Sequence, residues 1–133
     1  MLAALRSHRP RAARVLLVDD DPDTRVICRL ALEHHGYEVL EADQGELALR
    51  LSRRRLPDLV LLDLSLPVMD GWEVARRLKG APETADIPIV VFTAHAMAAE
   101  REKALAVGCD GYLVKPAGLR EVVEEVRRVL GAG

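Results

Sequence analysis

The sequence is poor in cysteine and has no long apolar run. Its two cysteines, Cys28 and Cys109, lie far apart without metal-ligand spacing, and small secreted domains carry a much higher cysteine density. We therefore expect a reducing, cytoplasmic location with both thiols inert. The longest uncharged apolar runs have the length of strands, far below the roughly 20 residues that span a bilayer. No membrane contact is expected.

Net charge is also small, because 19 Lys and Arg stand against 21 Asp and Glu, giving −2 at pH 7. This balance argues against non-specific nucleic-acid binding, so no DNA binding is expected. The 133 residues, half of them apolar, suit one domain and leave no room for a separate output domain. Residues 1–13 are basic and unpatterned, which predicts a flexible tail or, less favoured, a short basic contact arm. Residues 14–131 are expected to form the domain.

Short apolar runs alternate with helical patterns five times along the chain. The predicted strands are residues 15–18, 37–42, 59–62, 89–92 and 112–114. Four of them are nearly unbroken Val, Ile and Leu, as in strands buried on both faces of a parallel sheet. Right-handed crossovers then predict an α/β fold, a doubly wound (βα)5 chain whose five-stranded parallel sheet carries helices on both faces.

Capping signals mark where the helices begin and end. Asp21 before Pro22 predicts the start of the first helix, and Gly108 the end of the fourth. The acidic pairs with capping-box spacing ahead of the second and third helices are Asp43 with Glu46 and Asp70 with Glu73. The predicted apolar face of the first helix is Val26, Ile27, Leu30 and Ala31, and that of the last is Leu119, Val122, Val123, Val126 and Leu130.

Charged and hydroxyl side chains follow the predicted strands, at the edge of the sheet where ligands bind in such folds. The first strand runs into Asp19, Asp20 and Asp21, and the third into Asp63. Two carboxylates about 4 Å apart repel by roughly 4 kcal/mol at an effective dielectric near 20, so a compensating cation is needed. Oxygen ligands without His or Cys point to Mg²⁺. Asp21 is explained by helix capping alone, whereas Asp19, Asp20 and Asp63 are not.

Four segments together carry a family resemblance. They are residues 18–22 (VDDDP), 62–71 (LDLSLPVMDG), 91–94 (VFTA) and 111–116 (GYLVKP). From about Arg14 to Leu130 the chain resembles the receiver domain of bacterial response regulators, and residues 93–97 with 108–112 are similar to stand-alone receivers and to receivers of hybrid sensor kinases. The resemblance implies the sheet order 2-1-3-4-5.

The resemblance also implies a phosphoryl-transfer site. Asp63 matches the phosphoacceptor, a carboxylate nucleophile that takes a phosphoryl group from phosphohistidine. Asp20 and Asp63 would ligate Mg²⁺ directly, for which Mn²⁺ can substitute. The Ser65 backbone carbonyl would add a third ligand, and Asp19 would act largely through water. Lys115, before a typically cis proline, would pair with a phosphoryl oxygen.

Four further residues match switching or tuning positions. Thr93 would donate its hydroxyl to the phosphoryl group, and Tyr112 would follow it inward as the coupled rotamer switch. Ser65 and His95 match variable positions that tune the phosphoryl lifetime. Phe92 and Trp72 are interpreted as packing residues.

The implied function is a phosphorylation-controlled interaction module, with self-catalysed phosphorylation and dephosphorylation as its only enzymatic activity. The expected donor is a sensor histidine kinase or a histidine phosphotransfer protein. The expected output surface is the fourth helix, fifth strand and fifth helix, in a monomer or weak dimer. The sequence identifies no particular kinase, downstream partner or pathway, and a receiver cut from a hybrid kinase would look the same.

Three rival interpretations fit less well. An aspartate-nucleophile phosphohydrolase wants a second acid two residues after the nucleophile, where this chain has Ser65. A flavodoxin-type carrier needs a hydroxyl- and glycine-rich phosphate loop after the first strand, where this chain has three aspartates. A degenerate receiver should lack Asp63, Thr93 or Lys115, and all three are present.

Overall fold

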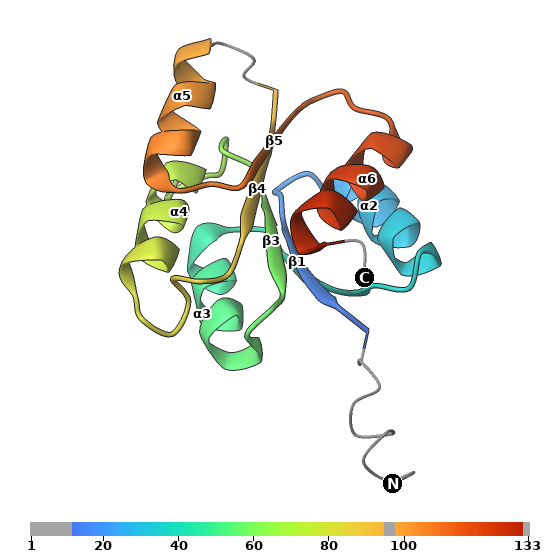
Figure 1. Cartoon of the computed structure of the whole chain (residues 1–133), viewed down its shortest axis with the longest axis horizontal. Helices are drawn as coiled ribbons and strands as arrows, with labels where there is room; N and C mark the ends of the chain where they lie inside the picture. The colour runs from blue at the N-terminus through green and yellow to red at the C-terminus, as the bar shows by residue number, and fades with distance from the viewer. Residues whose placement is uncertain (1–11, 95–97, 132–133) are drawn as a thin grey trace, which may run out of the picture.

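The computed structural model describes residues 12–94 and 98–131, in which strands and helices alternate along the chain (Figure 1). The strands are β1 (Arg14–Val18), β2 (Glu38–Ala42), β3 (Leu59–Leu62), β4 (Ile89–Thr93) and β5 (Gly111–Val114). The helices are α2 (Pro22–His34), α3 (Gly45–Arg55), α4 (Gly71–Gly80), α5 (Ala98–Val107) and α6 (Leu119–Leu130). These five helices are the predicted first to fifth helices in order.

The five strands form one parallel sheet in the order β2-β1-β3-β4-β5, which confirms the predicted fold class and strand order. The register aligns the ends of the strands, since Val18 of β1 lies opposite Leu62 of β3. The residue after each strand therefore emerges at the same edge. The Asp63 amide donates to the Val18 carbonyl at 2.9 Å, which places Asp63 beside Asp19.

The alternation of side chains along each strand divides the core into two layers. Leu16 and Val18 of β1 face a cluster with α3, α4 and α5, whereas Val15 and Leu17 face a cluster with α2 and α6. Figure 1 shows α2 and α6 together on one side of the sheet and the other three helices on the opposite side. The three central strands β1, β3 and β4 are almost wholly buried.

The capping predictions hold at two of three helices. Asp21 accepts a hydrogen bond from the Asp23 amide at 3.2 Å, and Asp70 accepts one from the Glu73 amide at 3.0 Å. The Glu73 carboxylate binds arginines of α4 instead of completing a capping box. The prediction for Asp43 was wrong: α3 begins one residue later than that pairing requires, with Gln44 as an N-cap that makes no side-chain hydrogen bond.

The predicted apolar face of α2 was wrong for three of its four residues, and only Ala31 packs against the core. Its buried residues are Cys28 and Leu32, whereas Val26, Ile27 and Leu30 are 43%, 50% and 55% exposed. Helical spacing groups residues into stripes, but several stripes of this short helix are apolar, and contact with the sheet selects only one of them. Leu119, predicted on the buried stripe of α6, is likewise exposed, and with Ile27 and Leu30 it lines an open groove between the two helices.

Most of the predicted N-terminal tail, residues 1–11, lies outside the described residues. Ala13, placed in the tail, is held to the sheet because its carbonyl accepts the Glu38 amide at 2.9 Å. Over residues 12–94 and 98–131, no helix is long and apolar enough to cross a bilayer.

Candidate functional site

Three carboxylates meet at the carboxyl edge of the sheet. Oxygens of Asp19, Asp20 and Asp63 all lie within 4.8 Å of one another. Asp19 and Asp63 are 1% and 5% exposed, whereas Asp20 faces solvent. The register of β1 and β3 brings together side chains 44 residues apart, because both strands end at the same level. The predicted acidic cluster is therefore present.

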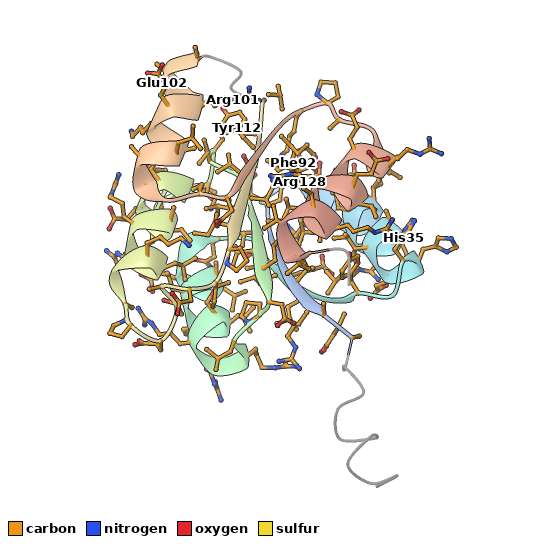
Figure 2. The ribbon with its side chains drawn as sticks, viewed as in Figure 1. His35, Phe92, Arg101, Glu102, Tyr112 and Arg128 are labelled. Atoms are coloured by element: carbon orange, nitrogen blue, oxygen red, sulfur yellow. The ribbon has the colours of Figure 1, made fainter. Side chains whose placement is uncertain are left out.

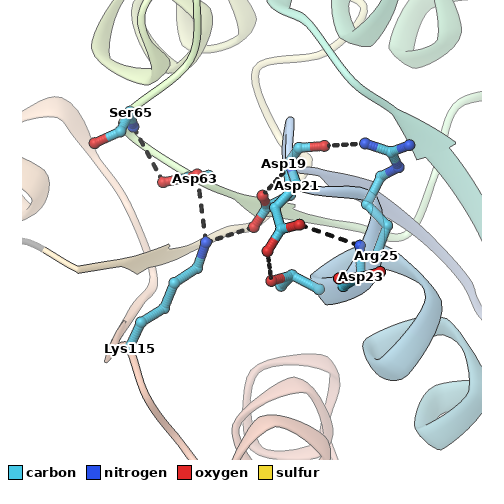
Figure 3. Close-up of polar contacts among 8 residues, drawn as sticks. Asp19, Asp21, Asp23, Arg25, Asp63, Ser65 and Lys115 are labelled. Carbon is cyan, nitrogen blue, oxygen red and sulfur yellow. Dashed lines mark hydrogen bonds and ion pairs between the residues drawn. The ribbon is translucent and has the colours of Figure 1, made fainter.

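Lys115 supplies a cation to this cluster (Figure 3). Its Nζ donates to Asp19 Oδ2 at 2.6 Å and to Asp63 Oδ2 at 3.4 Å. The Lys115 amide donates to the Thr93 carbonyl at 2.7 Å, which fixes the start of the loop after β5, and the following bond to Pro116 is cis, as the resemblance implied. Burial lowers the pKa of Lys115, but bonds and charges from Asp19 and Asp63 outweigh it, so the pKa is raised and the side chain stays charged.

Backbone amides orient the two buried carboxylates. Asp19 Oδ1 accepts the Asp21 amide at 2.9 Å, and Asp63 Oδ1 accepts the Ser65 amide at 3.0 Å. In both cases the aspartate side chain accepts a hydrogen bond from the backbone amide two residues later in the chain, which forms a local turn that short acidic side chains favour. The turns hold both Oδ2 atoms toward Lys115, as Figure 3 shows.

The pKa of Asp63 is raised, mainly because burial disfavours its charged form and also because Asp19 is negative. The Ser65 amide and Lys115 oppose this rise. A carboxyl group whose pKa is perturbed by burial, by a neighbouring carboxylate and by a neighbouring cation is typical of functional sites.

Thr93 and Tyr112 lie on neighbouring strands. Thr93 ends β4 and is fully buried. Tyr112, half-buried on β5, lies opposite Val91, and the Arg101 guanidinium of α5 lies 5.3 Å from its ring centroid (Figure 2). Tyr112 therefore lies at the contact between β5 and α5. The remaining predicted residue, His95, lies outside the described part of the chain.

Two contacts at the site were missed by sequence reasoning. Arg25 of α2 donates to the Asp19 carbonyl at 2.6 Å, and no motif signals it. Phe92, interpreted as packing only, also places its ring centroid 5.2 Å from Lys115 Nζ. An aromatic residue at the penultimate position of a strand that ends at the site was the available signal.

The donor set fits a hard divalent cation. Its three members offer carboxylate oxygens, and over residues 12–94 and 98–131 no such cluster contains His or Cys. Mg²⁺ prefers one or two carboxylates with water completing its octahedron, which suits a cluster open to solvent at Asp20.

Comparison with known proteins agrees with this geometry. The model of the family described as the response regulator receiver domain matches residues 15–127, so the chain belongs to that family. It is 43% identical over 116 residues to the phosphate regulon transcriptional regulatory protein PhoB of Pseudomonas aeruginosa. The aligned residues are 87% of this chain and 51% of that protein. An uncharacterized 14.6 kDa protein of Leptolyngbya boryana is 39% identical over 114 residues, or 86% of this chain and 87% of that one.

Solved structures show the same fold. The receiver domain of sensor histidine kinase PA1611 from Pseudomonas aeruginosa, with a magnesium ion coordinated in its active site cleft, matches with a TM-score of 0.83 and 32% identity. That match covers 90% of this chain and 98% of the other. Chemotaxis protein CheY4 of Vibrio cholerae matches with a TM-score of 0.85 and 30% identity, covering 89% and 98%.

The chain is thus a receiver domain of the two-component phosphorelay type, a signalling switch rather than a conventional enzyme. Membership in this family implies a histidine kinase as partner and Mg²⁺ binding at the acidic site. The chain spans about half the length of the first curated relatives it matches.

Proposed function

We propose that Asp63 accepts a phosphoryl group and that the resulting aspartyl phosphate switches the binding of a partner protein. The observation that carries this proposal is the buried Asp63 carboxylate, held by the Ser65 amide and lying beside two further carboxylates, Asp19 and Asp20, and the Lys115 ammonium. A nucleophilic carboxylate in such surroundings suits in-line attack on phosphorus.

The proposed step forms one bond and breaks one. An Asp63 Oδ lone pair attacks the phosphorus of phosphohistidine, and the P–N bond electrons leave with the imidazole of the kinase or phosphotransfer protein. The build-up of negative charge at Asp63 is the main obstacle, because the new group adds negative charge beside Asp19 and Asp20. Mg²⁺, with Mn²⁺ as a substitute, would neutralise charge on the transferring group.

The residues proposed to hold the ion are Asp20 and Asp63 directly, the Ser65 backbone carbonyl, and Asp19 largely through water. Lys115 would then exchange its bonds to the carboxylates for one to a phosphoryl oxygen. Thr93, at the neighbouring strand end, would donate its hydroxyl to another oxygen. Hydrolysis of the aspartyl phosphate by water would end the signal, with Ser65 and His95 tuning its rate.

The proposed output surface is α5, β5 and α6, the predicted fourth helix, fifth strand and fifth helix. Its support is the position of Tyr112, which is the second residue of β5 and contacts Arg101 of α5. A movement of Thr93 toward the phosphoryl group would open space for this ring. The partner would be a separate protein or a second copy in a weak dimer, without DNA contact by this domain.

We also propose that this domain works in the cytoplasm as a stand-alone receiver. Both cysteines, Cys28 and Cys109, are buried free thiols, and burial raises the pKa of each to about 11, so neither is poised for reaction. The Leptolyngbya relative of similar length is consistent with a stand-alone receiver. A receiver within a hybrid kinase is the second candidate, favoured by the similarity to the PA1611 receiver domain.

Incubation with acetyl phosphate tests the proposal. With Mg²⁺, intact mass should increase by one phosphoryl group, and chelation with EDTA should prevent the increase. Asp20→Asn should bind Mg²⁺ much more weakly in calorimetric titration and label slowly. Labelling of Asp20→Asn at the normal rate and Mg²⁺ dependence would overturn the metal assignment, and no labelling of the unmodified protein would overturn the phosphoacceptor assignment.

A further inference from the structure

The ring of Phe92 is placed against the Lys115 ammonium by the strand that carries it. Side chains alternate along β4, so Phe92 faces the layer of α2 and α6 while Thr93 faces the opposite layer. The Lys115 amide is bonded to the Thr93 carbonyl, which fixes the lysine backbone one residue from the ring. Nζ then lies over the ring, 5.2 Å from its centroid, within the range of a cation–π contact.

Packing alone does not hold the lysine side chain. Lys115 and Phe92 line an open pocket of about 290 Å³ with Cys28 and Pro116, so part of the lysine stem borders space rather than side chains. A lysine stem has four rotatable bonds and considerable rotamer freedom. Its ammonium needs specific contacts to stay at the site, and the described contacts are Asp19, Asp63 and the ring face of Phe92.

Phe92 differs from the other two contacts because its ring is neutral. If Asp19 and Asp63 engage a metal ion and a phosphoryl group, as the proposed function has it, they hold the lysine less. The ring keeps its attraction for a cation throughout. We propose that Phe92 is a positioning residue that holds the Lys115 ammonium at the phosphoryl site through the electron-rich face of its ring. This inference rests on the proposed function of Asp63 and Lys115.

The test uses the fact that Phe92 is the chain's one phenylalanine. Growth with mono-, di- or trifluorinated phenylalanine therefore changes this ring alone and weakens its electron-rich face stepwise with little change of shape. The rate of Asp63 labelling by acetyl phosphate and Mg²⁺ should fall stepwise. Its total loss should be about two- to fivefold, equivalent to the ~0.5–1 kcal/mol of such contacts at solvent-accessible sites. A ring that serves only to pack would give equal rates across the series.

NMR provides a second readout of position. The chain has three lysines, so the ε-methylene signals of ¹³C-labelled Lys79, Lys103 and Lys115 can be distinguished. The ring should shift the Lys115 signal, and Phe92→Leu should abolish that shift, whereas Lys103, whose Nζ lies 4.7 Å from the Trp72 centroid, should keep its own. Val90→Ala is the matched packing control, because Val90 belongs to the same strand and layer but has no aromatic ring to offer the lysine.

The outcomes separate the two proposals. Labelling of the unmodified protein with rates unchanged across the fluorinated series overturns the role of Phe92 and leaves the phosphoacceptor intact. Absence of labelling in the unmodified protein overturns the proposed function. A Lys115 signal in Phe92→Leu identical to that of the unmodified protein also overturns the positioning role, since the ring then does not face the lysine.

Discussion

Lys115 Nζ and Asp19 Oδ2 are joined by a 2.6 Å hydrogen bond between residues 96 positions apart in the chain. The Asp19 side chain is 1% exposed and that of Lys115 22%, so the pair lies at the boundary between the core and solvent. The acidic strand ends require a compensating cation, and in this structure the lysine supplies it. The pair therefore links the stability of the metal-free protein to its phosphorylation site.

Replacing Lys115 should destabilise the metal-free protein. In Lys115→Met the buried Asp19 carboxylate loses its cation, and the free energy of unfolding should fall by about 1–3 kcal/mol, the typical cost of leaving a buried polar group without its partner. Urea denaturation in EDTA measures this loss, and Mg²⁺ should restore part of it. Lys103→Met is the control, because the described contact of the Lys103 ammonium is with the Trp72 ring rather than with an acid. Equal stability of the two variants would contradict the account.

Asp63 should impose a pH dependence of the opposite sign to most carboxylates. Its pKa in the folded protein is raised above the ordinary 3.8, so the folded state holds this proton more tightly than the unfolded state. The free energy of unfolding therefore falls as pH rises from the unfolded pKa through the folded pKa, and the cost is complete above it.

Asp63→Asn removes this contribution. The difference in stability between the variant and the unmodified protein, measured by urea denaturation in EDTA, should grow from pH 3 toward neutral pH in favour of the variant, because burial and the Asp19 carboxylate both disfavour the charged form of Asp63. Subtracting the two curves cancels carboxylates common to both proteins, such as Asp21 and Glu73, whose pKa values are lowered. A difference that is constant with pH would show that Asp63 titrates normally.

Gly71 should be essential for the geometry of the loop after β3. Its amide donates to the Leu64 carbonyl at 3.0 Å, and a Cβ at this position would lie 2.6 Å from the Leu64 Cα. Because that neighbour is backbone, Gly71→Ala should cost about 1–3 kcal/mol as overpacking and slow Asp63 labelling. At Gly80 of the same helix a Cβ would meet nothing within 4 Å, so Gly80→Ala should be neutral or slightly stabilising. Thermal melts measure both variants, and a melting temperature of Gly71→Ala equal to or above that of Gly80→Ala would contradict this prediction.

Thr93→Ala should separate phosphorylation from its consequence. Labelling of Asp63 should persist, while the phosphorylation-dependent shifts of amide signals in α5 and β5 should shrink by more than half. Loss of about 1.4 kcal/mol of bias reduces a two-state population ratio tenfold. Tyr112→Ala should act in the same way, and Thr24→Ala, which removes a hydroxyl that bonds Asp21, should leave the shifts intact. Full shifts in both Thr93→Ala and Tyr112→Ala would place the coupling elsewhere.

The sequence predicts the sheet and the acidic site well for one physical reason. Unbroken aliphatic runs end abruptly in charged residues, and parallel strands bring those ends to one edge. Strand β3 is found at its predicted bounds, and Asp63 directly follows it. The aliphatic run of β3 thus predicts that Asp63, which follows it, lies beside the acidic residues that follow β1.

Contacts that depend on side-chain packing could not be predicted in the same way. The apolar residues Ile27 and Leu30 of α2 were assigned to the core, although Cys28 and Leu32 fill it, because helical periodicity alone does not tell which stripe meets the sheet. Phe92 is an apolar residue in a buried strand, which indicates only packing, and its approach to Lys115 depends on the path of the loop after β5. Neither the choice of the buried stripe of α2 nor the contact between Phe92 and Lys115 can be predicted from the spacing of apolar residues.

Locating the phosphoryl group tests the central claim most directly. After reaction with acetyl phosphate and Mg²⁺, borohydride reduction converts an aspartyl phosphate to homoserine, which peptide mapping by mass spectrometry assigns to one residue. Homoserine should appear at Asp63, disappear in Asp63→Asn, and persist in Asp70→Asn, which removes the N-cap acid at the far end of the same loop. Equal labelling of Asp63→Asn, or homoserine at another aspartate of the unmodified protein, would contradict the account.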